Sequence, residues 1–128
     1  MSFIGGTPAT LLSADPQLGP MLALVELRKA HPHLVRLDWQ LDEDGYLYGS
    51  AHSNLPNSPH FGTDLRMVIG AYADALGGEV AAPFRTEHKG RTIVHQYLRV
   101  TWQDVKFYIA VYSNIAAYPE LASEAVAA

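Results

Sequence analysis

The chain has 128 residues, 48% of them hydrophobic and 17% charged, which is enough apolar surface for the core of one globular domain. It contains no cysteine, so disulfides, thiol nucleophiles and zinc sites built on thiolates are excluded. A formal net charge of −4 disfavours nucleic acid and anionic membranes as partners. No apolar run reaches the length of a membrane span and the first residues lack a signal-peptide pattern, so we expect a soluble, cytoplasmic protein.

Residues 1–19 are rich in Gly, Pro, Ser and Thr and have no apolar periodicity, which predicts a flexible N-terminal arm. Gly19 and Pro20 then supply a helix start, because proline is favoured in the first helical turn. Apolar residues follow at helical spacing and stop near His31, so we predict a short first helix.

Residues 35–41 alternate between apolar and polar side chains, which predicts a strand with Trp39 on its core side. Residues 43–45, Glu-Asp-Gly, suit a three-residue hairpin loop with glycine in the left-handed position. The resulting hairpin would pair Trp39 with Gly49, and the missing side chain of the glycine would leave space for the indole ring.

A linker with two prolines precedes a second predicted helix over about residues 60–76. Its apolar side chains fall on one helix face, at Phe61, Leu65, Val68, Tyr72 and Leu76. Gly77 and Gly78 would end this helix with a left-handed cap.

Residues 80–87 alternate again and predict a third strand, in which Pro83 indicates an edge or a bulge. Residues 88–90, His-Lys-Gly, suit another three-residue loop that ends in glycine. This loop would pair Phe84 with Val94 and turn Phe84 toward the core.

The last hairpin, residues 91–112, organises the predicted fold. A two-residue turn at Gln103 and Asp104 would place Leu98 and Ile109 opposite each other on an apolar face. The intervening side chains would form an aromatic and charged face on the other side of the sheet.

The order α-β-β-α-β-β-β predicts an α+β fold, a two-layer sandwich with a mainly antiparallel sheet of about five strands and two helices on one face. We expect a single domain over residues 20–113. Residues 114–128 would form a C-terminal tail with a short helix that starts near Pro119.

Residues 72–80 (YADALGGEV), followed by hairpin strands, resemble a pattern found in small uncharacterised proteins of actinobacteria and their phages. The resemblance covers the second half of the chain and consists of a helix end with a glycine cap, so it implies no activity. The chain departs from that pattern at Gln103 and Asp104, where a glycine-containing pair is expected.

His31 and His33 could offer two ligands to one metal ion. A metal site would need a third ligand from elsewhere, such as His52, His60 or Asp64. A polar helix end explains the two histidines without a metal, and we expect no metal and no cofactor.

Ser50, His52 and Asp38 could share one sheet face as nucleophile, base and orienting acid, yet no G-x-S-x-G elbow accompanies them. The glycines at 77 and 78 end a helix, whereas a phosphate loop needs glycines that lead into one. We therefore do not expect an enzyme.

The outer sheet face combines aromatic and cationic side chains, a composition that is enriched at protein interfaces. The residues predicted to bind there are Arg36, Tyr46, Tyr48, His52, Arg85, His95, Tyr97, Arg99, Lys106, Tyr108 and Tyr112. Alternatively, the face is simply solvated, or is covered by residues 1–19 and 113–128. We expect a protein partner, most simply a second copy in a homodimer; a single-stranded nucleic-acid binder is the alternative, and a small-molecule enzyme comes third.

Overall fold

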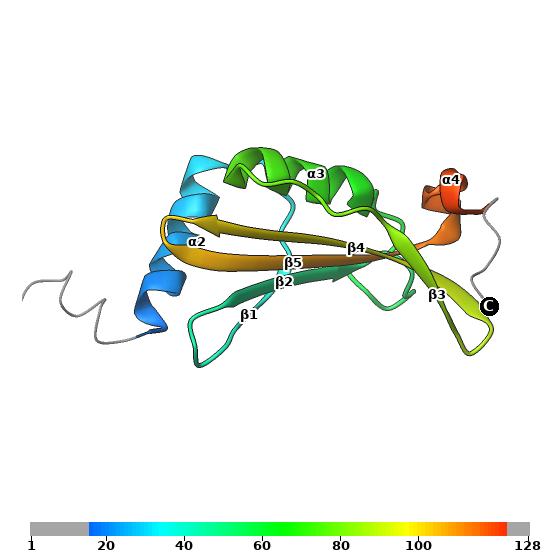
Figure 1. The fold of residues 1–128 in the computed structure, drawn as a ribbon, viewed down its shortest axis with the longest axis horizontal. Coiled ribbons are helices and arrows are strands. Elements are labelled where there is room, and N and C mark those ends of the chain that lie inside the picture. Colours follow the sequence, from blue (N-terminus) through cyan, green and yellow to red (C-terminus); the bar gives the residue numbers. More distant parts are fainter. Residues whose placement is uncertain (1–15, 123–128) are drawn as a thin grey trace, which may run out of the picture.

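A five-stranded sheet carries the fold in the computed structural model, which describes residues 16–122 (Figure 1). In chain order the elements are α2 (Leu18–Ala30), β1 (Asp38–Leu41), β2 (Leu47–His52), α3 (Leu65–Leu76), β3 (Phe84–His88), β4 (Arg91–Trp102), β5 (Val105–Asn114), the 3-10 helix η1 (Ile115–Ala117) and α4 (Pro119–Ala122). The strand order is β1-β2-β5-β4-β3; β2 and β5 are parallel and all other neighbours are antiparallel. The predicted α+β fold, its element order and its mainly antiparallel sheet are confirmed.

The helices α2 and α3 lie on the same side of the sheet (Figure 1). The helix α3 packs on both β4 and β5, and α2 contacts β5 alone among the strands with extensive contacts. The first helix begins at Leu18, inside the segment predicted as an N-terminal arm, and the rest of that segment, residues 1–15, lies outside the described residues. None of the described helices is long and apolar enough to cross a membrane.

Local signals set the two ends of α3. The helix starts at Leu65, later than predicted, because Asp64 has non-helical backbone angles and caps it by accepting a hydrogen bond from the Met67 N–H (3.2 Å). Gly77 ends it at φ 78°, a left-handed conformation that glycine adopts without cost. Its buried face consists of Leu65, Val68, Ile69, Tyr72, Ala73 and Leu76.

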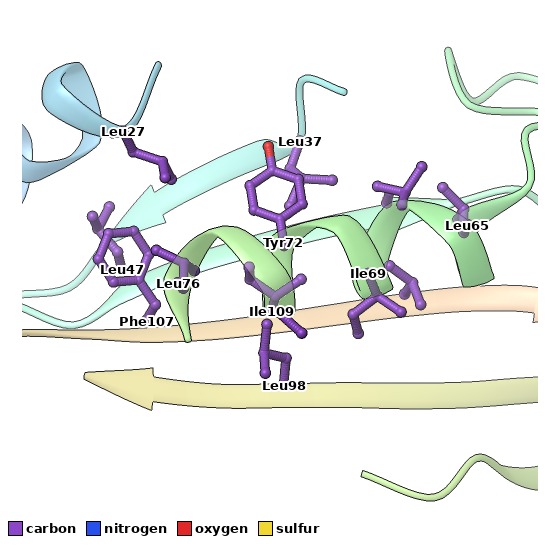
Figure 2. Packing of buried hydrophobic residues seen from close by; sticks show 14 of the residues in the cluster. Leu27, Leu37, Leu47, Leu65, Ile69, Tyr72, Leu76, Leu98, Phe107 and Ile109 are labelled. Carbon is purple, nitrogen blue, oxygen red and sulfur yellow. The ribbon is translucent and has the colours of Figure 1, made fainter. Parts of the chain in front are cut away.

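The main core lies between α3 and the sheet (Figure 2). The strands contribute Leu47, Ala51, Leu98, Val105, Phe107, Ile109 and Val111, and α2 adds Ala23 and Leu27. The indole ring of Trp39 closes one side, with edge contacts to Phe107 and Tyr72 at ring-centroid distances of 5.9 and 6.1 Å. These side chains hold the sheet rigidly against the helices.

The first hairpin has the predicted register, with Trp39 opposite Gly49 and Gly45 at φ 89° in the loop. A β-carbon added at Gly49 would lie 2.8 Å from the Trp39 ring, so only glycine fits there. The first strand is shorter than predicted. The carbonyl of Val35 accepts a hydrogen bond from the Tyr72 hydroxyl (2.6 Å) instead of joining the sheet.

The central hairpin also has the predicted register, including the pair Leu98 and Ile109. Gln103 and Asp104 form its two-residue turn with φ values of 51° and 61°. Both residues therefore adopt the left-handed backbone of a primed turn without a glycine.

The hairpin between β3 and β4 corrects the sequence prediction. Its turn contains two residues, Lys89 (φ 51°) and Gly90 (φ 76°), and His88 pairs with Arg91. The predicted three-residue loop was wrong, because Lys89 tolerates the left-handed conformation that was assigned to glycine alone. The strand also starts later than predicted, and Val80 forms only an isolated bridge.

The corrected register moves two side chains to the opposite faces. Phe84 pairs with His95 rather than with Val94, so it leaves the core side. Arg85 pairs with Val94, a buried core residue, and therefore lies on the helix side of the sheet.

The segment after β5, predicted as the start of a C-terminal tail, packs on the sheet as far as Leu121. Tyr118 is fully buried beside Val94 and donates a hydrogen bond from its hydroxyl to Gln96 Oε1 (2.7 Å). The predicted short helix is present as α4, which contains Leu121.

Candidate functional site: the open sheet face

The sheet face opposite α2 and α3, here called the open face, has no helix over it among the residues that the structure describes (Figure 1). Strand register places on it Asp38, Gln40, Tyr48, Ser50, His52, Phe84, Thr86, His88, Arg91, Ile93, His95, Tyr97, Arg99, Thr101, Lys106, Tyr108, Ala110, Tyr112 and Asn114. Tyr46 precedes β2 and contacts this group through Tyr48, at a ring-centroid distance of 6.4 Å.

Tyrosine rings from three strands of the open face touch one another in a continuous series. Tyr48 of β2 lies 5.6 Å from Tyr108 of β5, and Tyr108 lies 5.6 Å from Tyr97 of β4, measured between ring centroids. Tyr97 also contacts Phe84 of β3 at 5.5 Å. The parallel pairing of β2 with β5 makes this series continuous, because it sets Tyr48 directly beside Tyr108.

A second series of rings completes what we call the ring network. Phe84 stacks on His95 (4.9 Å), His95 meets Tyr112 edge to face (5.2 Å), and Tyr112 stacks on His52 (4.4 Å). His95 is further held by a 2.8 Å hydrogen bond between its Nε2 and the Thr86 hydroxyl. Rings from β2, β5, β4 and β3 therefore touch without a break.

Two cations stand at one end of the network. The Arg99 guanidinium lies 4.9 Å from the Tyr108 ring centroid, and Lys106 Nζ lies 5.0 Å from that of Tyr46 while donating to its hydroxyl (3.1 Å). Both line a hollow of about 420 Å³, together with Tyr48. Within residues 16–122, neither cation has a carboxylate within ion-pair distance.

Burial among neighbouring rings changes the titration of the network. It lowers the pKa of the His52 and His95 imidazoles, although the Asp38 carboxylate partly opposes this shift at His52. Burial also raises the pKa of the Tyr97 and Tyr112 hydroxyls. At neutral pH these four side chains are therefore uncharged rings.

The structure brings most of the predicted binding residues together. On the open face lie Tyr48, His52, His95, Tyr97, Arg99, Lys106, Tyr108 and Tyr112, with Tyr46 at its margin. Arg36 is exposed and precedes β1, outside the strand pairing. Arg85 was wrongly assigned to this face. Phe84 was missed, although a two-residue turn at Lys89 and Gly90 would have identified it.

The other candidate sites gain little from the structure. Asp38, Ser50 and His52 share the open face, but no hydrogen bond joins any two of them. The rings of His31 and His33 lie 5.9 Å apart. In the described part of the chain, no three His, Asp or Glu side chains gather closely enough to hold a metal ion.

What the open face offers chemically is flat aromatic area, the cations Arg99 and Lys106 at one end, Arg91 at the other end of β4, and carboxylates at Asp38 on the edge strand and at Asp42 beside Tyr48. Comparison of the chain with protein-family models, curated proteins and solved structures found no match. Aromatic area with arginine at its border suits association with a protein surface, and aromatic area alone also suits base stacking.

Proposed function

We propose that this protein acts by binding another protein through the open face, and that its simplest partner is a second copy of the same chain. The ring network is the observation that supports this proposal most strongly, because it leaves a large aromatic area that no element within residues 16–122 covers. A cytoplasmic location is part of the proposal, and the absence of cysteine fits it.

The rings of the network are already ordered before any partner arrives. Stacking fixes Phe84 on His95, hydrogen bonding fixes His95, and Arg99 lies over Tyr108. A partner that covers these side chains would therefore cost little side-chain entropy and would remove apolar surface from water. Preordered tyrosine and arginine residues of this kind dominate binding energy at interfaces.

A carboxylate placed in the middle of the network tests the proposal. Tyr97→Glu would bury a charge twice in a symmetric dimer, because a two-fold interface uses the same residues of both copies. We expect light scattering to show a dimeric wild type and a monomeric Y97E.

Met67→Glu is the matched control, because Met67 is 73% exposed on α3, in the helix layer rather than on the open face. It should leave the dimer intact. A wild type that stays monomeric would remove self-association from the proposal, and a Y97E dimer as stable as the wild type would place the contact elsewhere.

Single-stranded nucleic acid is the second candidate partner, favoured by the contiguous rings beside Arg99 and Lys106. The net charge of −4 opposes it, and we expect no binding of a fluorescent oligonucleotide near physiological salt. Tight, salt-sensitive binding that Tyr97→Ala and Arg99→Ala both weaken would replace the protein partner with a nucleic acid.

A further inference from the structure

Two opposite charges occupy different sides of the open face. Arg99 on β4 pairs with Tyr108, Tyr108 pairs with Tyr48, and Tyr48 pairs with Gln40, so Arg99 and Gln40 stand in one row across four strands. Asp38 lies two residues from Gln40 on the edge strand β1. The positive and the negative group are thus separated diagonally across the face.

Strand geometry gives the size of this separation. Three gaps of about 4.8 Å between strands and two residues of about 3.3 Å along the strand place Asp38 and Arg99 roughly 16 Å apart. The midpoint falls between β2 and β5, with Ser50 and Ala110 on one side of it and Tyr48 and Tyr108 on the other. The small side chains leave space for a second sheet on their side, and the two tyrosine rings offer contact area on the other.

We propose that two copies of this chain meet through their open faces about a two-fold axis near Ser50 and Ala110, with Asp38 of each copy against Arg99 of the other. This inference rests on the proposed function and names the polar contacts of that interface. The axis lies in the plane between the two faces, passes through the midpoint and is perpendicular to the line from Asp38 to Arg99. It therefore places each of these groups against the opposite group of the other copy, and the dimer contains two identical ion pairs.

The unpaired state of both groups supports this arrangement. Asp38 and Arg99 are exposed, and within residues 16–122 neither forms an ion pair. His52, which lies near Asp38, is kept neutral at pH 7 by its lowered pKa, so it does not neutralise the carboxylate. Arg99 also borders the hollow that contains Lys106, which leaves room for the edge strand of the second copy.

A second copy fits these charges better than an acidic segment of another protein or a nucleic acid does. Either polyanion would engage Arg99 and Lys106 but would leave Asp38 without a partner and facing like charge. A second copy matches both ends of the diagonal. Charge complementarity therefore selects this occupant.

Charge reversal tests the pairing with two single variants, Asp38→Lys and Arg99→Glu. In each variant alone, both contacts of the dimer become like-charged, and self-association measured by sedimentation should weaken roughly 10- to 100-fold. An equal mixture of D38K and R99E should associate again, because one contact of the mixed dimer joins the two introduced charges and the other joins the two native ones. The double variant D38K/R99E should likewise dimerise within a few-fold of the wild type.

Thermal melts at a protein concentration below the dimerisation range show whether each variant is folded, and both substitutions sit at exposed positions. A wild-type dimer that survives both single reversals, or single variants that weaken association but fail to recover it on mixing, would overturn the charge pairing and leave the open-face interface standing. A monomeric wild type would overturn self-association itself.

Discussion

The two faces of the sheet are built from alternate residues of the same strands, yet they differ in chemistry and in what covers them. On the helix side of β4 and β5, Leu98, Ile109 and Val111 are almost completely buried beneath α3. On the open side, the neighbouring Tyr97 and Tyr108 are only half-buried and touch other rings. Burial in the core explains the apolar side chains of the first face. The aromatic side chains of the second face are not covered by any element within residues 16–122.

The contrast also separates two kinds of polar group. On the helix side, the buried Tyr118 hydroxyl and Gln96 are paired with each other, although the buried Trp39 Nε1 has no hydrogen-bond partner in the described part of the chain. The open side leaves Arg99 and Asp38 without ion-pair partners in the described part of the chain. A face with ordered rings and unpaired charges has the features of a surface that binds.

Leu98→Ala should show the largest effect, because it breaks the covered face. The side chain is 1% exposed and packs in the main core, so its removal should cost about 2 to 5 kcal/mol of unfolding free energy. Urea unfolding measures the loss. A cost below about 1 kcal/mol would contradict the assignment of this face to the core.

Gly49→Ala should follow, because the covered face has no room for a methyl group beside Trp39. The added carbon would lie 2.8 Å from the indole ring and should cost roughly 1 to 3 kcal/mol. Ser50→Ala, one residue away on the open face, is the matched control and should change stability by less than about 0.5 kcal/mol. Equal losses in both variants would show that the two faces are packed alike.

Two histidines of the open face, His52 and His95, should make the unfolding free energy depend on pH. Burial lowers the pKa of His52 and His95 in the folded state, so the unfolded chain takes up protons first as the pH falls below the ordinary value of 6.5. The contribution of the two histidines to the unfolding free energy is therefore largest above pH 6.5, and it should decline as the pH falls through 6.5 toward the folded pKa values. Urea midpoints between about pH 8 and pH 5.5 would follow the decline.

The double variant H52N/H95N should lose that part of the pH dependence, because neither position can then titrate. A slope that is unchanged in this variant would assign the titration to groups outside the ring network.

Arg99→Ala should show the smallest effect on the isolated chain. The guanidinium is exposed and its contact with the Tyr108 ring should contribute about 0.5 kcal/mol. Urea unfolding at low protein concentration measures this value without a contribution from association. A loss as large as that of L98A would show that both faces are buried within one chain.

Much of the fold could be predicted because alternation and turn residues are local signals. The pairs Trp39 with Gly49 and Leu98 with Ile109 follow from the apolar period and the loop lengths. The register of β3 could not be predicted correctly, because it depended on Lys89 adopting positive φ in place of glycine. Because the turn has two residues and not the predicted three, every side chain of β3 lies on the face opposite to the predicted one.

The candidate site was predictable in composition but not in arrangement. Each hairpin places its own tyrosines on the outer face, yet only the parallel pairing of β2 with β5 sets Tyr48 beside Tyr108. That pairing joins strands far apart in the sequence, and no local pattern encodes it. The same long-range contact fixes the diagonal between Asp38 and Arg99.

The central claim, that the open face joins two copies of this chain, is tested most directly by sedimentation equilibrium of the wild type over concentrations that reach tens of micromolar. The expected result is a reversible rise from the 14.0 kDa chain mass to twice that mass, with a midpoint that shifts upward in concentrated salt. A mass that stays at 14.0 kDa throughout this range would contradict the claim.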